Sequence, residues 1–291
     1  MTRDEQRRKA AGFLALHEAP PLLILPNAWD VASARLFEIE GFRAVGTTSA
    51  GIAATLGYPD GQVMNLEENA DVVRRITRNI AAPVSADMEA GYRDTTEGIV
   101  ESARIFLDAG VAGLNIEDST GDADAPLFDI SLMQERIGAI REMAASEGIP
   151  LVLNVRTDVY LCLCAGKGPE ACLRETVSRG NAYRQAGADC VFVPTWLDEP
   201  GFLDRETIVC LVSELDAPLN LLGGAVTLPI AELEQIGVAR VSVGPGPMRA
   251  ALGLIREISR ELLEKGTCTG MTAKAIPYSE VNHWFDRGRS V

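Results

Sequence analysis

The stretch "PVSADMEAGYRDTTEGIVESARIFLDAGVAGLNIE" (residues 83–117) shows the unit from which we expect the fold to be built. A short apolar run from Pro83 ends in carboxylates, a helical stretch follows, and Gly110 precedes the next apolar run. A Gly at the end of a helix accepts the left-handed backbone that a C-cap requires. The period is strand, loop, helix, Gly and strand, which is typical of a parallel sheet covered by helices.

The same unit recurs along the chain. Eight apolar runs bounded by Gly, Pro, Asn or Asp are candidate strands: "LLIL" (22–25), "AVGTT" (44–48), "PVSAD" (83–87), "GLNIE" (113–117), "PLVLNV" (150–155), "CVFVP" (190–194), "PLNLL" (218–222) and "RVSVG" (240–244). Stretches with helical spacing between them include 30–41, 95–110, 130–148, 172–187 and 230–237. Eight such strands close a (β/α)8 barrel, so we predict the α/β class and a TIM barrel.

This barrel explains the chain as a single domain over residues 1–291, with its core at about 20–265. We expect a helix from Thr2 to His17 before the barrel and a C-terminal helical extension over 266–291. The alternative is an open doubly wound sheet. That fold typically carries G-x-G-x-x-G after its first strand, where this chain has "LPNAWD" (25–30).

Composition limits the partners and the compartment. The formal net charge of −14 would make nucleic acid and anionic membranes repel the average surface, so we expect neither as a partner. The apolar run near the N-terminus is too short for a signal peptide or a membrane span. The six cysteines form no C-x-x-C pair, which favours free thiols in a reducing compartment. We therefore expect a cytoplasmic protein.

Polar side chains follow the predicted strands, at the barrel end where such folds carry their chemistry. They are Asn27, Asp30, Thr47, Thr48, Ser49, Asp87, Glu89, Asn115, Glu117, Asp118, Asn154, Arg156, Asp158 and Asn220. Acids gathered in one barrel mouth repel one another unless a cation neutralises them. A ligand set made only of oxygen favours Mg²⁺, with Mn²⁺ as the alternative, over Zn²⁺.

Asp87 and Glu89 are the first candidates for this metal site. Residues i and i+2 share a face of an extended chain, so we predict that both carboxylates, together with Glu117, address one hydrated ion. The alternative is that these acids cap the following helix or pair with Arg93.

Arg156 follows the fifth predicted strand and is the candidate for binding a substrate carboxylate, because its guanidinium can hold one bidentately. The alternative is a structural ion pair with Asp158 or Glu117. None of the four lysines ends a predicted strand, which argues against a Schiff-base aldolase. The two histidines, His17 and His283, fall outside the predicted barrel, which argues against an imidazole base on a strand.

Four stretches in this order resemble the isocitrate lyase and phosphoenolpyruvate mutase superfamily, and its phosphoenolpyruvate mutase-like branch in particular. They are "AVGTTSAGIAATLGYPDGQ" (44–62), "SADMEAGY" (85–92), "GLNIEDS" (113–119) and "NVRTD" (154–158), and the similarity runs from about Leu25 to Gly253. The resemblance implies a (β/α)8 barrel with Mg²⁺ in its mouth and a tetramer of dimers that exchange their last helix. It also implies chemistry on 2-oxo or 2-hydroxy acids next to an enolate.

The resemblance further implies roles for individual residues. Asp87 would be the nearest metal ligand, Glu89 and Glu117 would hold metal-bound waters, Asp60 would face the same water shell, and Arg156 would bind the substrate carboxylate.

It also implies a set of groups that receive the substrate oxygens. Thr48, Ser49, Ala50 and Gly51 would supply hydroxyl and backbone N–H groups to the carboxylate and the enolate oxygen. Asn220 matches a polar position on the seventh strand of the lyases.

Two departures from the superfamily narrow the expected reaction. The lyases carry a K-[KR]-C-G-H loop whose cysteine protonates the product, but residues 119–129 here read "STGDADAPLFD". The mutases end their sixth strand in a His, where this chain has Pro194 and Thr195.

We therefore expect a Mg²⁺-dependent lyase that cleaves a C–C bond of a small 2-oxo or 2-hydroxy carboxylic acid through an enolate, for example by oxaloacetate-type decarboxylation. The alternatives are a phosphonopyruvate-type hydrolase or mutase and a non-catalytic barrel that binds 2-oxo acids. A homotetramer or homodimer is expected.

Overall fold

A computed structural model of the chain describes residues 1–18, 20–163, 168–195, 203–224 and 227–286. It contains two compact units, Met1–Gly244 and Pro245–Val291. In the described part of the second unit, three helices follow one another: α12 (Gly246–Lys265), α13 (Thr269–Ala273) and α14 (Tyr278–His283). The single domain that the sequence suggests stays a prediction.

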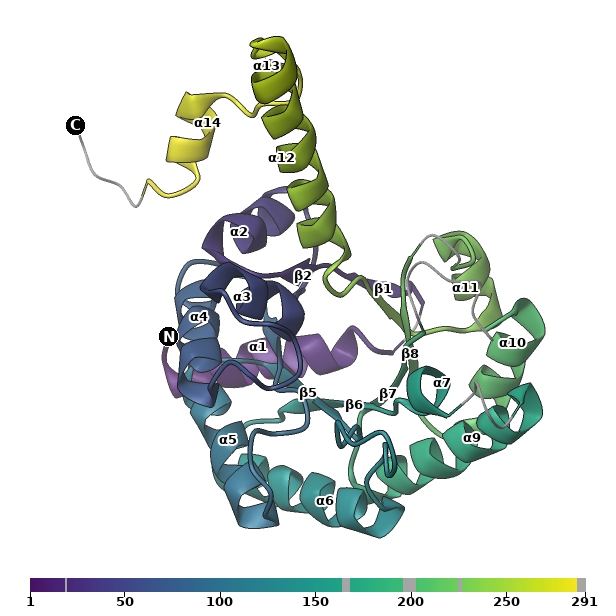
Figure 1. The fold of residues 1–291 in the computed structure, drawn as a ribbon. Coiled ribbons are helices and arrows are strands. Elements are labelled where there is room, and N and C mark those ends of the chain that lie inside the picture. The colour runs from purple at the N-terminus through teal and green to yellow at the C-terminus, as the bar shows by residue number, and fades with distance from the viewer. Residues whose placement is uncertain (19, 164–167, 196–202, 225–226, 287–291) are drawn as a thin grey trace. The chain divides into compact units, whose positions relative to one another are not determined.

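The first unit is a barrel of parallel strands, seen end-on in Figure 1. Its strands are β1 (Leu23–Leu25), β2 (Asn27–Ala28), β3 (Val45–Thr47), β4 (Val84–Asp87), β5 (Gly113–Glu117), β6 (Val152–Arg156), β7 (Cys190–Val193), β8 (Leu219–Leu222) and β9 (Arg240–Ser242). Their order is β1-β9-β8-β7-β6-β5-β4-β3-β2. Each of the eight predicted runs contains a strand, so the predicted TIM-type barrel is confirmed.

The first predicted strand differs from expectation because it is divided into β1 and β2. Pro26 lies between them and has no N–H to donate to a sheet ladder. β1 pairs with β9, whereas β2 pairs with β3. The Asn27 side chain joins the two edges, since its Oδ1 accepts from Val243 N and Gly244 N, both at 2.9 Å, and its Nδ2 donates to Thr47 O. One chain segment therefore forms both ends of the strand order.

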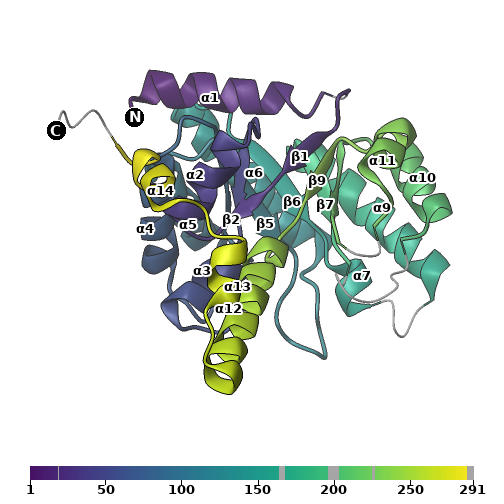
Figure 2. The ribbon, with the colours of Figure 1, turned by 90° about the horizontal axis from the view of Figure 1, so that it is seen from above.

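Helices cover the outside of the barrel, and the first of them lies across one of its ends (Figure 1 and Figure 2). They are α1 (Arg3–Ala15), α2 (Val31–Ile39), α3 (Ser49–Leu56), α4 (Leu66–Thr77), α5 (Thr96–Asp108), α6 (Ile130–Ser146), α7 (Val159–Cys162), α9 (Pro169–Ala186), α10 (Arg205–Glu214) and α11 (Ile230–Ile236). Several begin at a side-chain cap, as at Asp30, which forms a capping box with Ser33. Others end at a left-handed Gly, as α9 does at Gly187. The predicted N-terminal helix and all five predicted helical stretches are present.

Within the described residues, no helix is long and apolar enough to cross a membrane. Four cysteines, Cys162, Cys190, Cys210 and Cys268, are free thiols, whereas Cys172 is disulfide-bonded. The expectation of six free thiols is therefore wrong at Cys172, because disulfide formation depends on how close two Cα atoms lie in the fold and not on C-x-x-C spacing. Cys164 lies outside the described residues.

Helix α1 closes the end of the barrel opposite to α7 (Figure 2). Phe13 and His17 are buried there, with their rings in an edge contact at 4.8 Å between centroids. A Cβ at position 113 would lie 2.7 Å from the Phe13 ring, so the Gly at the start of β5 gives that ring its space. The sequence predicts His17 outside the barrel strands, and the structure confirms this: His17 is buried against Phe13 at the end of the barrel that α1 closes.

His17 is expected to make the stability of the protein depend on pH. Burial and the nearby Arg240 charge lower the pKa of His17 to about 4, whereas an unfolded chain has a His pKa of about 6.5. Between these values only the unfolded state binds the proton. The free energy of unfolding should therefore have its full value above about pH 6.5 and decrease by about 3 kcal/mol as the pH drops to about 4.

Urea unfolding at a series of pH values tests this expectation with two variants. H17Q should remove about 3 kcal/mol of the pH dependence. H283Q changes an exposed histidine and should retain the full wild-type slope. Equal slopes in wild-type protein and H17Q would contradict the assignment.

Candidate active site

The predicted charged residues meet at the C-terminal end of the barrel because parallel strands end on the same side. Asp87 is the last residue of β4, Glu117 the last of β5 and Arg156 the last of β6. In the strand register, Glu117 pairs with Arg156 and Asp87 pairs with Asn115. Four separate stretches of sequence thus form one charged cluster, which we call the mouth cluster: Asp60, Asp87, Glu89, Glu117 and Arg156.

Asp87 is held by the residues that precede and begin α3. Its Oδ2 accepts from Ser49 N at 3.1 Å and from Ser49 Oγ at 2.8 Å, while its backbone N–H donates to Thr47 Oγ1. The N-terminus of a helix favours a negative charge. The hydrogen bond to Oδ1 is a long one, 3.4 Å from Glu89 N, so this oxygen is the better placed to bind an ion.

Glu89 lies in the turn after β4. Its φ of +51° is left-handed, so the assumption that Asp87 and Glu89 share a face of an extended strand is wrong: the strand ends at Asp87. The carboxylate accepts from Gln62 N at 2.6 Å and from Tyr92 Oη at 2.8 Å. Burial and the Asp87 charge nevertheless raise the pKa of Glu89 to about 7. The two acids therefore interact electrostatically although their backbones diverge.

Arg156 forms both ion pairs that the sequence offered as its structural alternative. Its Nη1 lies 2.8 Å from Glu117 Oε2, and its Nε and Nη2 donate to the two oxygens of Asp158 at 2.5 and 2.8 Å. Burial opposes the charged form, but the two carboxylates hold the pKa of Arg156 well above its ordinary value. A quarter of the side chain stays exposed, so a ligand can still reach Arg156.

The pKa of Glu117 is raised as well. Burial raises its pKa well above the ordinary value; Arg156 opposes this shift, and the charges of Asp158, Asp87 and Glu89 add to it. Asp60 lies in the exposed loop after α3, where partial desolvation and the Asp87 charge also raise its pKa. Several acids thus raise one another's pKa values across the mouth.

Asp158 is positioned by a second, fully buried acid. Asp118 Oδ1 accepts from Asp158 N at 2.9 Å, and its Oδ2 accepts from Tyr183 Oη at 2.7 Å, Thr157 Oγ1 at 2.8 Å and Arg179 Nη1 at 3.2 Å. This network fixes the backbone that presents Asp158 to Arg156. It is a structural support for the mouth cluster.

The remaining predicted site residues lie as follows. Thr48 is the N-cap of α3, and its hydroxyl accepts from Gly51 N at 3.3 Å. Ser49, Ala50 and Gly51 form the first turn of that helix. Asn220 is buried on β8, where its amide donates to Ser242 Oγ. Thus Ser49 contacts the mouth cluster directly, whereas the hydrogen bonds of Gly51 and Asn220 are with neighbouring structural groups.

Two supporting residues were not singled out from the sequence. Asn69, buried on α4, donates to Asp87 O at 3.1 Å and to Tyr92 Oη at 2.8 Å. The Gln62 side chain accepts a hydrogen bond from Tyr92 N at its Oε1, and the Gln62 backbone N–H donates to the Glu89 carboxylate. Tyr92 could have been noticed, since it follows Glu89 by three residues. The role of Asn69 has no local sequence signal because it depends on how α4 packs beside β4.

The donor set fits a hydrated divalent cation. Among the described residues, no three His, Cys, Asp or Glu side chains are close enough together to bind an ion directly. A cation would therefore be held by Asp87 Oδ1, with Glu89 and Glu117 acting through water, which suits Mg²⁺. Burial is the main cause of the raised pKa values of Glu89, Glu117 and Asp60, and the Asp87 charge adds to each. A cation bound here would stabilise the charged forms of these acids.

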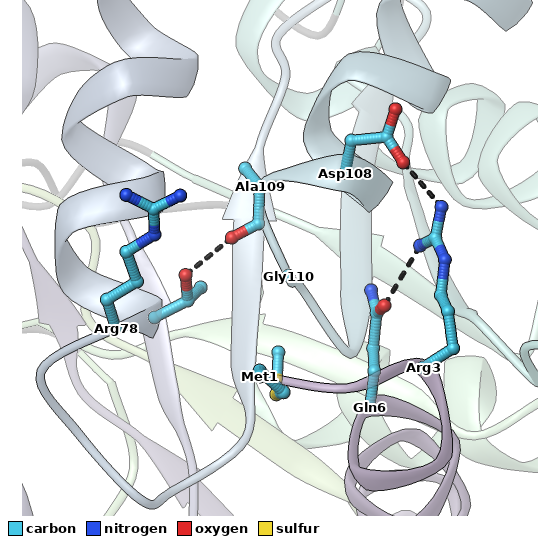
Figure 3. A pocket seen from close by; sticks show the side chains of 8 residues that line it. Met1, Arg3, Gln6, Arg78, Asp108, Ala109 and Gly110 are labelled. Carbon is cyan, nitrogen blue, oxygen red and sulfur yellow. Dashed lines mark hydrogen bonds and ion pairs between the residues drawn. The ribbon is translucent and has the colours of Figure 1, made fainter.

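A separate cavity of about 360 Å³ lies between the N-terminus of α1 and the C-terminal ends of α4 and α5 (Figure 3). It is lined by Met1, Arg3, Gln6, Thr77, Arg78, Asp108, Ala109 and Gly110. Arg3 crosses it to pair with Asp108 and Gln6. The helix ends place this cavity opposite the mouth cluster, on the barrel face that usually serves stability.

Comparison with known proteins relates this geometry to a family. The phosphoenolpyruvate phosphomutase family profile matches residues 13–263. An uncharacterized protein of Mycobacterium tuberculosis is 33% identical over 271 residues, which cover 92% of this chain and 94% of the relative. "Probable 2-methylisocitrate lyase 1" of Corynebacterium glutamicum is 30% identical over 271 residues, covering 92% and 85%. Oxaloacetate decarboxylase of Bradyrhizobium sp. is 28% identical over 265 residues, covering 88% and 84%.

Two crystal structures share the fold over almost the whole chain. A protein assigned to the lyases or mutases from Burkholderia cenocepacia has a TM-score of 0.88 and 36% identity, covering 98% of each chain. 2,3-Dimethylmalate lyase, a member of the phosphoenolpyruvate mutase/isocitrate lyase superfamily, has a TM-score of 0.79 and 25% identity, covering 95% of this chain and 94% of its own. These matches confirm the expected superfamily and its class of enzyme, the lyases and mutases. The chain therefore belongs to the phosphoenolpyruvate phosphomutase family, within the phosphoenolpyruvate mutase/isocitrate lyase superfamily.

Proposed function

We propose that this protein is a Mg²⁺-dependent lyase that cleaves a C–C bond of a small 2-oxo or 2-hydroxy carboxylic acid through an enolate. The observation that carries the proposal is the mouth cluster, in which acids with raised pKa values gather beside one partly exposed arginine, Arg156. Relatives named 2-methylisocitrate lyase and oxaloacetate decarboxylase support the same bond type. Mn²⁺ is the alternative cation.

The chain's own groups divide the work as follows. The open part of Arg156 binds the substrate carboxylate, and the Asp158 and Glu117 pairs fix its direction. Ser49 orients Asp87 through two hydrogen bonds, and the first turn of α3 presents its positive end to the developing enolate oxygen. When bound at Asp87, the cation would supply Lewis-acid polarisation of the substrate carbonyl.

Water supplies the proton that the enolate takes up at the end of the reaction, because the loop after β5 offers no Cys, Lys or His for this step. Ser119 and Leu127 form an antiparallel bridge, and within the same loop Thr120 Oγ1 donates to Ala125 O and Thr120 N donates to Pro126 O. The loop residues 119–129 include no Cys, Lys or His. Decarboxylation needs no strong base at this point, so an oxaloacetate-type substrate suits the site better than a tricarboxylate.

An assay against a panel of acids tests the proposal. Oxaloacetate, 2-methylisocitrate, 2,3-dimethylmalate and phosphonopyruvate would each be incubated with the enzyme while Mg²⁺ is titrated, and pyruvate and phosphate would be measured. We expect Mg²⁺-dependent pyruvate without phosphate. Phosphate release from phosphonopyruvate would instead indicate P–C chemistry, and binding without turnover would indicate a non-catalytic barrel.

We further propose a cytoplasmic homo-oligomer, a tetramer or a dimer, with a small carboxylic acid as its ligand and no nucleic-acid or membrane partner. The net charge of −14 supports the exclusion of polyanionic partners. Light scattering on the purified protein would measure the number of subunits.

A further inference from the structure

The interior of the barrel contains a fully buried arginine, Arg240, at the start of β9. Its Nη1 lies 3.5 Å from His17 Nε2, its Nη2 lies 3.5 Å from Asn115 Oδ1, and its guanidinium faces the Phe13 ring at 5.9 Å. Its Nε has no hydrogen-bond partner among the described residues. The groups that touch this charge are therefore neutral ones, and the contacts are long.

The titratable groups beside Arg240 are neutral as well. His17 Nδ1 lies 2.9 Å from Phe13 O, so we assign the proton to Nδ1, which leaves a lone pair on Nε2 facing Arg240. Burial lowers the pKa of His17 to about 4 and raises the pKa of Cys190 to about 12. Both groups are uncharged near neutral pH. A buried charge without an anionic partner is costly, so a more distant negative charge must offset it.

Asn115 links Arg240 to the acids of the mouth cluster described above. Asn115 is the register partner of Asp87 in the sheet. Its backbone carbonyl accepts a hydrogen bond from the N–H of Met88, the residue after Asp87. Burial lowers the pKa of Arg240 to about 10, and the Asp87 charge opposes this shift. Three buried polar strand residues are linked to Arg240: Asn115 bonds to it, Asn154 donates to Asn115, and Asn220 is the register partner of Arg240. Most TIM barrels fill this space with Val, Ile and Leu, so this interior is specialised for a charge.

We propose that Arg240 is the internal counter-charge of the active site, which offsets the mouth carboxylates from below and holds Asn115 beside Asp87. It is a positioning residue that touches no substrate, and the inference rests on the proposed function. Its positive charge weakens the hold of the mouth on a divalent cation and strengthens the hold on an anionic substrate. The two effects have opposite signs.

Binding measurements at pH 8 test this proposal with two probes, Mn²⁺ and oxalate. Over about 10 Å and at an effective dielectric constant of about 20, a unit charge changes the affinity for a doubly charged ion by roughly 100-fold. R240M should therefore bind Mn²⁺ roughly 100-fold more tightly and oxalate roughly 100-fold more weakly than the wild-type protein. Loss of both affinities together, or no change in either, would overturn the proposal.

R136M is the matched control, because Arg136 is an equally buried arginine that stacks on Phe128 outside the barrel. It should leave both affinities unchanged even if it lowers the melting temperature. R240K keeps the charge and provides a test if R240M does not fold. Its two affinities should stay within about threefold of wild type, whereas a joint loss of both would show that charge is not what Arg240 supplies.

The wild-type protein separates this inference from the proposed function. Wild-type protein that binds neither probe would contradict the metal-dependent function itself. Wild-type binding of both probes, with no opposite shifts in R240M, would contradict only the role of Arg240.

Discussion

D87N is expected to abolish turnover, with a loss of at least about 100- to 1,000-fold in kcat. The substitution keeps the size and shape of the side chain but removes the charge nearest to the proposed cation. Ser49 N and Oγ can still donate to the Asn oxygen, so the fold should remain. Mn²⁺ titration should show weak binding or none, and circular dichroism should be unchanged.

D71N is a suitable control for this experiment. Asp71 is an exposed acid on α4 that pairs with Arg74 on the outer face of the helix. The variant has the same net charge as D87N and should keep wild-type activity and Mn²⁺ affinity. Full activity in D87N would show that the cation is not held at the end of β4.

Much of the fold could be predicted because local sequence and tertiary structure agree there. The run "GLNIE" is β5 from its first residue to its last, since a buried parallel strand needs a short apolar run with defined ends. Pro26 shows what the apolar pattern alone misses. The pattern predicted one strand, but the missing N–H divides it, and Asn27 then joins the two edges.

The members of the candidate site could be predicted, but their mutual geometry could not. The carboxyl ends of parallel strands bring Asp87, Glu117 and Arg156 together whatever the loops do. Glu89 lies two residues beyond the strand with a left-handed backbone, and its carboxylate is held by Gln62 and Tyr92, which come from two loops. An argument from i and i+2 spacing holds only while the strand continues.

The role of Arg240 was beyond sequence reasoning for a related reason. It opens the run "RVSVG", at the strand end opposite the chemistry, so its type gave no indication of a link to the mouth. Only the closed barrel brings it against Asn115 and His17, residues that are 125 and 223 positions away in the chain. The role of a buried charge depends on the residues around it, and the residues around Arg240 are distant from it in the sequence.

R156Q is expected to affect both stability and binding. Removing the guanidinium leaves the carboxylates of Glu117 and Asp158 buried without their cation, and breaking such a pair typically costs about 3–5 kcal/mol of unfolding free energy. If Arg156 also binds the substrate carboxylate, oxalate affinity should fall by about 100-fold as the charge-assisted bonds are lost. Urea unfolding and calorimetric titration would measure the two effects separately.

The double variant R156Q/D158N distinguishes the two roles of Arg156. It removes one of the two stranded charges, and an Asn at position 158 can bond to the Gln amide, so about half of the lost stability should return. Oxalate affinity should not return, because no cationic group is left to face the ligand. Recovery of both stability and oxalate affinity would mean that Arg156 serves only to hold Asp158 and Glu117 in place, and that the substrate carboxylate is bound by another group of the mouth.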